Sequence, residues 1–323
     1  MALWLVAGRA LPAPGSAALS EALTARALEQ IVARAQSAPR LSHSRKGERA
    51  AREGAPALVE HAGRAYKVRA YPDEGQAVAR VALLDLAGDA FPPCHGRSGR
   101  HLVFTYLEAG AAPCDFDALG AFCARLAAAA VLEPVSDFEG WCDRLVAAGM
   151  FRAATGRRAR RAHARAPRAE WGLEYLDVDP VNFVCRDGAA CCIDEKHLAV
   201  APRGAGTLLP ERKFPDQAEA FRAAYERSGW SPPLDDRGYR RFVTAYHLAY
   251  LLAEKSARSP LASARRSPQL HAQRRDFLRA IGAPPWARAR EEIPWLVAFR
   301  WARARKELRR RTKRMRRALR ARR

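Results

Sequence analysis

Apolar residues recur along this chain at two different spacings, and the change between them predicts where helices give way to strands. Positions three or four apart are typical of amphipathic helices. The segments with this spacing are residues 17–38, 73–87, 116–131, 138–150, 216–228, 240–257 and 267–281. Between residues 41 and 71, short apolar segments alternate with turns instead, which predicts a β-hairpin around Ala62-Gly63-Arg64.

A second strand pattern lies from Arg100 to Glu108, after a turn predicted at residues 96–99. The stretch from Glu174 to Leu198 reads as a loop followed by a hairpin. There, Phe183-Val184-Cys185 and residues 190–193 read as two short strands, because the Asp-Gly pair between them favours a hairpin turn.

Polar side chains surround this last hairpin at regular positions. Asn182 follows Asp177 by five residues, with Pro180 between them keeping the backbone out of a helix, and Asp194 ends the return strand. Phosphoryl transfer from ATP needs a carboxylate at the acceptor hydroxyl, and an amide and a second carboxylate for magnesium. Asp177, Asn182 and Asp194 suit those roles in that order. Ordinary surface turns between two core strands are the alternative explanation.

This pattern resembles the catalytic and metal-binding loops of the protein-kinase-like superfamily. It is most similar to the branch that contains aminoglycoside and choline phosphotransferases and bacterial sugar (lipopolysaccharide) kinases. The sequence departs from the family pattern at two places. Tyr175 stands where the family usually has His, and Glu195-Lys196 follows Asp194 where protein kinases have Phe-Gly. The second departure argues against a protein Ser/Thr kinase, which is the third candidate.

The resemblance implies further residues in the N-terminal half. A lysine on the second hairpin strand would contact the ATP phosphates, and Lys67 matches it, with Arg69 on the same strand face as its competitor. A glutamate on the next helix would pair with that lysine, and Glu74 is the acidic candidate near the start of the helix. The loop that covers the phosphates would lie at residues 42–49, which hold one glycine.

Composition places the chain among globular proteins, with 323 residues of which 49% are hydrophobic. Its seven cysteines show no Cys-x-x-Cys spacing, so they read as buried thiols in a reducing cytosol. We expect a cytoplasmic protein, because the first residues lack a signal-peptide pattern and no apolar segment approaches the length of a membrane span.

The net charge of +22 is concentrated at the C-terminus, where Arg300–Arg323 holds fourteen lysines or arginines and one glutamate. A final helix is predicted from Ile293-Pro294. Its apolar residues fall near one stripe at Trp301, Ala304, Leu308, Met315 and Leu319. An anionic membrane surface is the first interpretation, ahead of a disordered tail and of nucleic acid. The basic segment at residues 152–168 suits a solvated face or an anionic substrate.

Placed on this order of strands and helices, the resemblance implies an α+β, two-lobed protein-kinase-like fold with a small β-rich N-lobe and a mostly helical C-lobe, to which the sequence adds a basic C-terminal helix. The expected parts are a helical extension at residues 1–40, the N-lobe at 41–108, the C-lobe at 109–290 and the tail at 291–323. We expect an ATP- and magnesium-dependent phosphotransferase for a hydroxyl of a small molecule or cell-envelope glycan, cytoplasmic or peripheral at the inner membrane face. The alternative is a catalytically degenerate kinase-fold scaffold.

Overall fold

The computed structural model describes residues 23–39, 55–108, 114–129, 137–165, 169–186, 188–227, 236–258, 261 and 267–321. The chain forms two compact units. Unit 1 comprises residues 1–135 and 170–232, and unit 2 comprises residues 136–169 and 233–323. This division cuts across the expected lobes, whose boundaries therefore stay a prediction.

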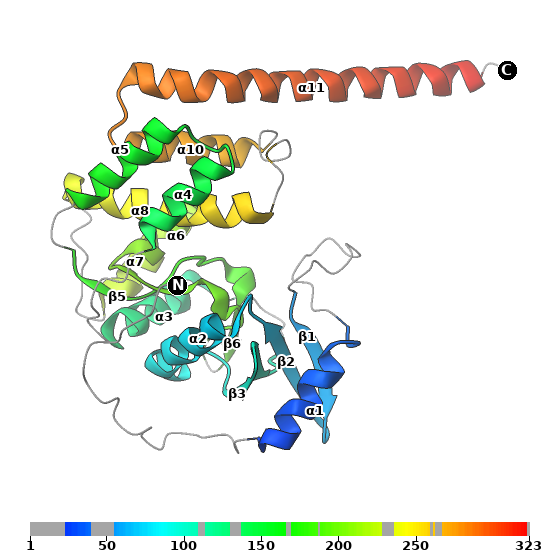
Figure 1. Cartoon of the computed structure of the whole chain (residues 1–323), viewed down its shortest axis with the longest axis vertical. Helices are drawn as coiled ribbons and strands as arrows, with labels where there is room; N and C mark the ends of the chain where they lie inside the picture. Colours follow the sequence, from blue (N-terminus) through cyan, green and yellow to red (C-terminus); the bar gives the residue numbers. More distant parts are fainter. Residues whose placement is uncertain are drawn as a thin grey trace. The chain divides into compact units, whose positions relative to one another are not determined.

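Unit 1 contains a four-stranded antiparallel sheet with its strands in the order β1-β2-β4-β3 (Figure 1). The strands are β1 (Ala57–His61), β2 (Arg64–Ala70), β3 (Cys94–Ser98) and β4 (His101–Thr105). Ala62 and Gly63 form the β1–β2 turn with φ angles of 50° and 72°. Both angles lie in the left-handed region that the favoured two-residue hairpin requires. The predicted hairpin and the strand after residue 100 are thus confirmed.

One face of this sheet is covered by α1 (Ala25–Ala35), which begins after the cap residue Thr24. The core between them consists of Leu28, Ile31, Ala35, Ala57, Val59, Tyr66, Val68 and Val103. Successive side chains of a strand point to opposite faces. Because Tyr66 and Val68 belong to this core, Lys67 and Arg69 point to the other face of β2.

The rest of unit 1 combines four helices with two small antiparallel sheets, in which β5 pairs with β8 and β6 pairs with β7. The helices are α2 (Glu74–Ala87), α3 (Phe116–Ala129), α6 (Leu208–Lys213) and α7 (Ala218–Glu226). The strands are β5 (Trp171–Tyr175), β6 (Phe183–Arg186), β7 (Ala189–Cys192) and β8 (Leu198–Pro202). Helices α3 and α7 approach closely at Gly120, where a Cβ atom would lie 2.3 Å from the carbonyl oxygen of Phe221.

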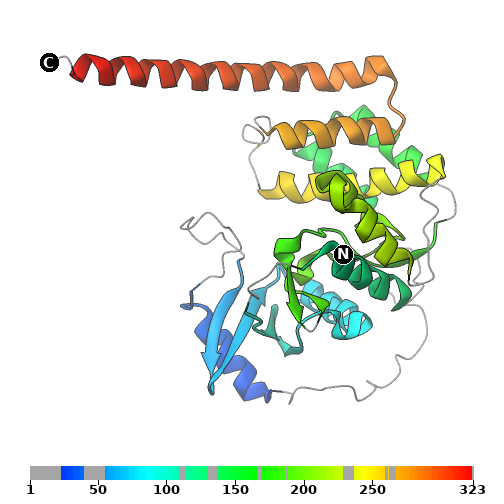
Figure 2. The same ribbon diagram turned by 180° about the vertical axis from the view of Figure 1, so that it is seen from behind.

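All the regular secondary structure of unit 2 among its described residues is helical (Figure 2). Its helices are α4 (Phe138–Ala147), α5 (Ala153–Ala164), α8 (Arg237–Arg258), α10 (Pro268–Ala280) and α11 (Pro285–Ala321). Trp141 of α4 packs edge-on against Tyr246 and Tyr250 of α8, with ring centroids 4.9 and 5.3 Å away. Among the described helices of both units, none is long and apolar enough to cross a bilayer.

Buried contacts fix the start of α11 in unit 2. Arg274 of α10 is 1% exposed, donates to the Met150 carbonyl at 3.0 Å and lies 3.8 Å from the ring centroid of Trp295. Glu291 accepts hydrogen bonds from the Thr155 hydroxyl at 2.5 Å and from the Arg152 backbone at 3.0 Å. These contacts belong to residues before 300, whereas Trp301, Leu308 and Met315 farther along the helix are more than half exposed.

Several elements differ from the sequence prediction, among them β5 and α6, which were not predicted. Strand β3 occupies residues expected to turn, and β8 was not predicted, because neither segment alternates apolar and polar residues. Helix α11 begins at Pro285 rather than near Ile293, so Pro294 stands inside it, where proline removes one backbone hydrogen bond. The buried residues Glu291 and Trp295 stabilise the helix on both sides of that proline.

Candidate active site

The loop after β5 brings Asp177 and Asn182 together. Pro180–Asn182 forms a single 3₁₀ turn, which begins after the cap residue Asp179. From there the Asn182 amide donates to the backbone carbonyl of Asp177 at 2.9 Å and to its carboxylate at 3.2 Å. Burial raises the pKa of Asp177, although its side chain keeps 32% of its surface exposed. The loop thus presents an oriented carboxylate that solvent can still reach.

Asp194 lies at the end of β7, where it is 3% exposed. Arg69 donates to its Oδ1 at 2.9 Å, and the Lys196 ammonium contacts its Oδ2. Burial alone would raise the pKa of Asp194, but these two cations and His197 hold it well below the usual range. Asp194 therefore stays ionised at neutral pH. The Tyr175 hydroxyl donates to its backbone carbonyl at 2.9 Å, so this tyrosine supports the loop.

His197 connects the two carboxylates, although the sequence did not single it out. Its Nε2 lies 3.4 Å from Oδ2 of Asp177 and 3.9 Å from Oδ2 of Asp194. The histidine is 4% exposed, and its ring contacts Tyr175 at 6.1 Å between centroids. Asp177 and Asp194 thus belong to one polar cluster, as the spacing of the motif predicted.

Lys67 reaches this cluster from β2. Its ammonium donates to the Ile193 carbonyl at 2.7 Å and to Glu195 Oε2 at 2.5 Å, and it lies 4.7 Å from the centroid of the Phe104 ring. The side chains of Lys67 and Glu195 are 5% and 1% exposed. Lys67 therefore forms a buried ion pair with the residue next to Asp194.

Arg69 and Tyr71, two and four residues after Lys67, also bind Glu195. Arg69 forms an ion pair with its Oε1, and the Tyr71 hydroxyl donates to the same oxygen at 3.1 Å. Burial would raise the pKa of Glu195, but Arg69 and Lys67 lower it below the ordinary value. One strand thus holds both acids at the end of β7, and Arg69 serves Asp194 and Glu195 rather than replacing Lys67.

Helix α2 does not supply the acid that we expected to pair with Lys67. Glu74 lies at its first turn, where its side chain is 63% exposed and pairs with Arg97. One turn and a half later, Arg80 donates to the backbone carbonyls of Glu195 at 2.9 Å and Lys196 at 3.2 Å. Helix α2 thus binds the segment after Asp194 through a cation, and Glu195 takes the place expected for Glu74.

Glu174 of β5 is a buried acid that the sequence pattern did not indicate. It is 2% exposed and accepts hydrogen bonds from the backbone amides of Gly204 at 2.9 Å and Gly206 at 2.8 Å. Burial raises its pKa to about 7. A Cβ atom on Gly206 would lie 2.8 Å from the Tyr175 carbonyl oxygen. This glycine therefore allows the loop at 204–207 to pack directly against β5.

The donor chemistry of the cluster suits a hard divalent cation. Asp194 and Asn182 supply carboxylate and amide oxygen, the ligands that magnesium prefers. Among the described residues, no group of three or more His, Cys, Asp or Glu side chains is arranged for a metal ion. Magnesium at phosphoryl-transfer sites is commonly held by one or two protein groups together with phosphate oxygens, so a smaller set fits it. The loop expected at residues 42–49 lies outside the described residues.

Comparison with solved structures identifies the fold. The crystal structure of LicA in complex with AMP matches with a TM-score of 0.53 and 13% identity, over 79% of this chain and 96% of that one. The choline kinase LicA from Streptococcus pneumoniae matches at 0.49 and 14% identity, over 72% and 89%. A choline/ethanolamine kinase family protein from Mesorhizobium loti matches at 0.45 and 17%, over 77% and 90%.

No protein-family profile matches the chain, and no curated protein matches it significantly. The first of these structural likenesses shows that the chain has the α+β protein-kinase-like fold. The resemblance drawn from the Asp177 loop is thus confirmed at the level of the fold.

Proposed function

We propose that this chain is an ATP- and magnesium-dependent phosphotransferase that acts on a hydroxyl group of a small molecule or a cell-envelope glycan. The observation that carries the proposal is the convergence of Lys67, Asp177, Asn182 and Asp194 through His197 and Glu195. The protein-kinase-like fold supports it, because LicA, which has a similar fold, was crystallised in complex with the nucleotide AMP.

Asp177 is the proposed base. Its carboxylate is held by Asn182 and remains partly exposed, so an acceptor hydroxyl can approach it. The oxygen of that hydroxyl attacks the γ-phosphorus of ATP, the bond from that phosphorus to the bridging oxygen of ADP breaks, and the hydroxyl proton passes to Asp177. The pKa of Asp177, raised by burial, makes it a stronger base than an ordinary aspartate.

Asp194 and Asn182 are the proposed magnesium ligands. Magnesium held by these residues would neutralise the negative charge that develops on the transferred phosphoryl group. The depressed pKa of Asp194 keeps its carboxylate ready for a cation. Lys196, whose side chain is 31% exposed, contacts the oxygen that the metal would take, so we expect this lysine to move when the metal binds.

Lys67 is the proposed contact to the ATP phosphates. Glu195 fixes its ammonium at the edge of the cluster, beside the carbonyl of Ile193. The role that we first gave to Glu74, positioning Lys67 for the nucleotide, therefore passes to Glu195 in this proposal. A lysine without such an acid would retain its charge but lose its orientation.

Binding without catalysis is the second candidate, and one observation favours it. Both carboxylate oxygens of Asp194 have cationic partners, Arg69 and Lys196, which suits a closed structural ion network. In that case, the chain would be a scaffold built on a kinase fold. A protein Ser/Thr kinase ranks third, because Glu195-Lys196 stand where that class has Phe-Gly.

Thermal melting separates the first two candidates. The purified chain is melted alone, with ATP, with magnesium and with both, and Asp194→Ala is melted under the same four conditions. A ligand at a hundred times its dissociation constant adds about 2.7 kcal/mol of stability. We expect a shift that needs both ATP and magnesium and that disappears in the variant. Equal melting in all four conditions would favour the scaffold.

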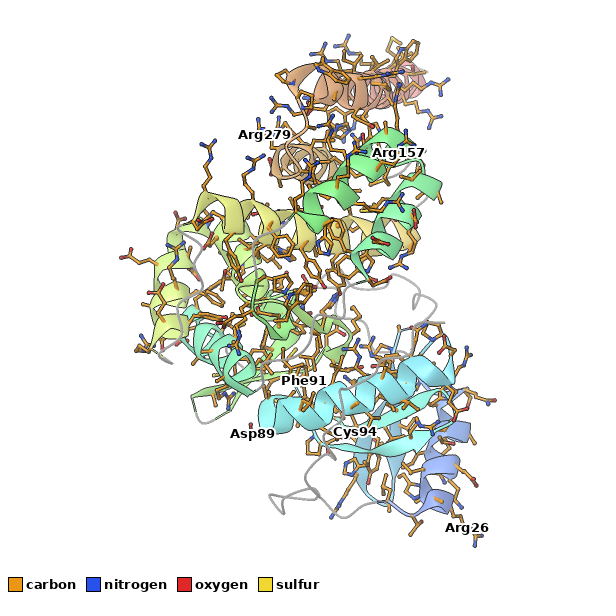
Figure 3. All side chains as sticks on the ribbon, turned by 60° about the vertical axis from the view of Figure 1, so that its left-hand side comes forward. Arg26, Asp89, Phe91, Cys94, Arg157 and Arg279 are labelled. Carbon is orange, nitrogen blue, oxygen red and sulfur yellow. The ribbon has the colours of Figure 1, made fainter. Side chains whose placement is uncertain are left out.

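Turnover then tests the roles, with consumption of ATP measured against a panel of hydroxyl acceptors. Asp194→Ala should abolish turnover, and Asp177→Asn should reduce it about 10²- to 10⁴-fold while magnesium-dependent ATP binding persists. Asp89→Asn is the matched control, because Asp89 is a surface acid of the same unit with its side chain 92% exposed (Figure 3). Wild-type turnover in either active-site variant would refute the assignment.

We also propose that α11 attaches the chain to the inner, anionic face of a membrane. Its apolar side chains Trp301, Leu308 and Met315 are 66%, 66% and 61% exposed. They stand seven residues apart, which is close to two helical turns, so they share one face. Arginines and lysines occupy most of the remaining positions. An exposed apolar stripe in a basic helix suits the interface of an anionic bilayer.

Vesicle co-sedimentation tests this attachment. We expect binding to vesicles that contain phosphatidylglycerol and little binding to phosphatidylcholine alone. Trp301→Gln with Leu308→Gln removes apolar area without changing charge, and should weaken binding to the anionic vesicles. If this variant binds as wild type does, only electrostatic attraction acts. Preference for RNA over vesicles would favour nucleic acid as the partner.

A further inference from the structure

A hollow of about 630 Å³ lies in unit 2, where the first turns of α8 meet the end of α10 and the start of α11. The charged side chains that line it are Arg237, Arg240, Arg241, Asp276, Arg279 and Arg288. Five arginines against one aspartate leave an excess of four positive charges. Figure 3 shows Arg279 in this unit, on a different helix from Arg157 of α5.

The position of three of these arginines is unfavourable for helix α8. Three of them, Arg237, Arg240 and Arg241, lie in the first turns of α8, where the helix dipole favours acidic residues. Asp236 accepts from the Tyr239 amide at 2.7 Å and so caps this end. The excess positive charge beyond that cap is not needed for the helix, and an anion in the hollow would offset it.

Hydrogen bonds within the hollow leave donors available. Arg241 donates to the Arg279 carbonyl at 3.4 Å, and Arg279 lies 3.4 Å from Asp276 with 57% of its side chain exposed. The buried Nε of Arg288 has no hydrogen-bond partner among the residues that the structure describes. Gly282, with φ of 67°, lets the Arg241 guanidinium approach the turn after α10, since a Cβ atom there would lie 3.0 Å from it.

A second hollow of about 410 Å³ adjoins the first and shares Arg241 and Ala280 with it. Most of its lining is apolar or aromatic, including Phe242 and Ile281. Guanidinium groups bind phosphate oxygens through paired N–H donors, which makes clustered arginines a phosphate site. The two hollows together suit a ligand with a phosphate at one end and an apolar body at the other.

We propose that the arginine-lined hollow binds the phosphate of an amphiphilic phosphomonoester, whose apolar part enters the adjoining hollow. Such a ligand can be a membrane lipid with a phosphomonoester headgroup or a soluble organic phosphate. The site belongs to unit 2 and the candidate active site to unit 1, so this proposal does not rest on the proposed function.

Calorimetric titration of the full chain tests it, with inorganic phosphate and hexyl phosphate as the two probes. We expect hexyl phosphate to bind at least tenfold more tightly than inorganic phosphate. Arg237→Gln with Arg279→Gln should weaken hexyl phosphate binding at least tenfold, because each charged hydrogen bond lost costs about a factor of ten or more. Both replaced side chains are exposed, so the fold should persist.

Arg157→Gln with Arg161→Gln is the matched control, since it removes the same charge from exposed positions of α5. An equal loss in both double variants would show nonspecific attraction and overturn the proposal. Unchanged binding in the hollow variant would place the probe elsewhere and overturn it too. Equal affinity for inorganic phosphate and hexyl phosphate would overturn the proposal that the adjoining hollow binds the apolar part of the ligand. The magnesium-dependent ATP shift should remain in the hollow variant, which separates this test from that of the active site.

Vesicles of phosphatidylcholine with a minority of phosphatidic acid distinguish the two sources. A lipid ligand predicts that the hollow variant binds phosphatidic acid vesicles more weakly than wild type does, but binds phosphatidylglycerol vesicles of equal charge like wild type, because α11 is intact. A soluble ligand predicts unchanged vesicle binding together with the loss of hexyl phosphate binding.

Discussion

Replacing Glu195 by glutamine tests the reassigned partner of Lys67. Glu195 is 1% exposed, accepts from Lys67 at 2.5 Å and from Tyr71 at 3.1 Å, and also pairs with Arg69. Glutamine keeps the shape and one acceptor oxygen but removes the charge. Lys67 then lies buried without an ionised partner, and Arg69 retains only Asp194.

The expected cost follows from burial. Removing one partner of a buried ion pair typically costs about 3–5 kcal/mol of unfolding free energy. Because glutamine still accepts one hydrogen bond, we expect the lower end, about 3 kcal/mol. For a unit of this size, about 2–4 °C per kcal/mol would lower the melting temperature by about 6–12 °C.

Differential scanning calorimetry and urea unfolding measure this loss, and Glu74→Gln is the matched control. Glu74 pairs with Arg97 at an exposed position, where ion pairs are worth about 0–1 kcal/mol. In a double-mutant cycle, Lys67→Met with Glu195→Gln should cost less than the sum of the single variants by about 1–3 kcal/mol. A larger loss from Glu74→Gln than from Glu195→Gln, or a cycle without coupling, would refute the pairing.

Three further outcomes are expected. The pKa of Glu174 is raised from 4.5 to about 7, so the folded state binds more protons in that window and loses stability as pH rises through it. Glutamine cannot ionise, so the unfolding free energy of Glu174→Gln should rise relative to that of wild type by up to about 3 kcal/mol between pH 4.5 and 7. Urea unfolding at several pH values measures this, and a difference that does not change with pH would contradict it. Gly120→Ala should destabilise unit 1 by about 1–3 kcal/mol in thermal unfolding, because the added Cβ would meet the Phe221 carbonyl. Gly75→Ala, where no backbone atom lies near the added Cβ, should instead stabilise it by up to about 1 kcal/mol. Arg274→Ala should cost unit 2 about 3 kcal/mol or more, since it leaves Glu291 buried without its cation, and a loss below 1 kcal/mol would contradict that role.

The parts of the site that are close together in sequence were predictable. Asp177, Asn182 and Asp194 surround one hairpin, so their spacing and the Asp-Gly turn predict a shared location before any tertiary contact is known. Lys67 was predictable only through the resemblance. Alternation along β2 then placed it opposite the core, as the structure confirms.

The partner of Lys67 was not predictable, because Lys67 and Glu195 are 128 positions apart and no local pattern connects them. On α2, Arg80 is a cation in the helix where an acid was expected. It donates to the backbone carbonyls of residues 195 and 196. Strand β8 was missed for a related reason. Its residues are small and continuously apolar, and its pairing with β5 depends on a contact that sequence periodicity does not record.

The ion network at the end of β7 determines which cationic partner of Asp194 is most easily replaced. Lys67 and Arg69 are 5% and 9% exposed and hold Glu195 and Asp194 from within the fold. Lys196 is 31% exposed, and its ammonium contacts Asp194 from the solvent side. A cation that takes the oxygen held by Lys196 releases an ammonium at the surface, while the two buried pairs keep their charge balance. Exchange at Lys196 therefore costs less desolvation than exchange at Lys67 or Arg69, since only that side chain is already partly hydrated. The same sequence feature that departs from the protein-kinase pattern, Glu195-Lys196 after Asp194, thus supplies both the fixed acid for Lys67 and the mobile cation for Asp194.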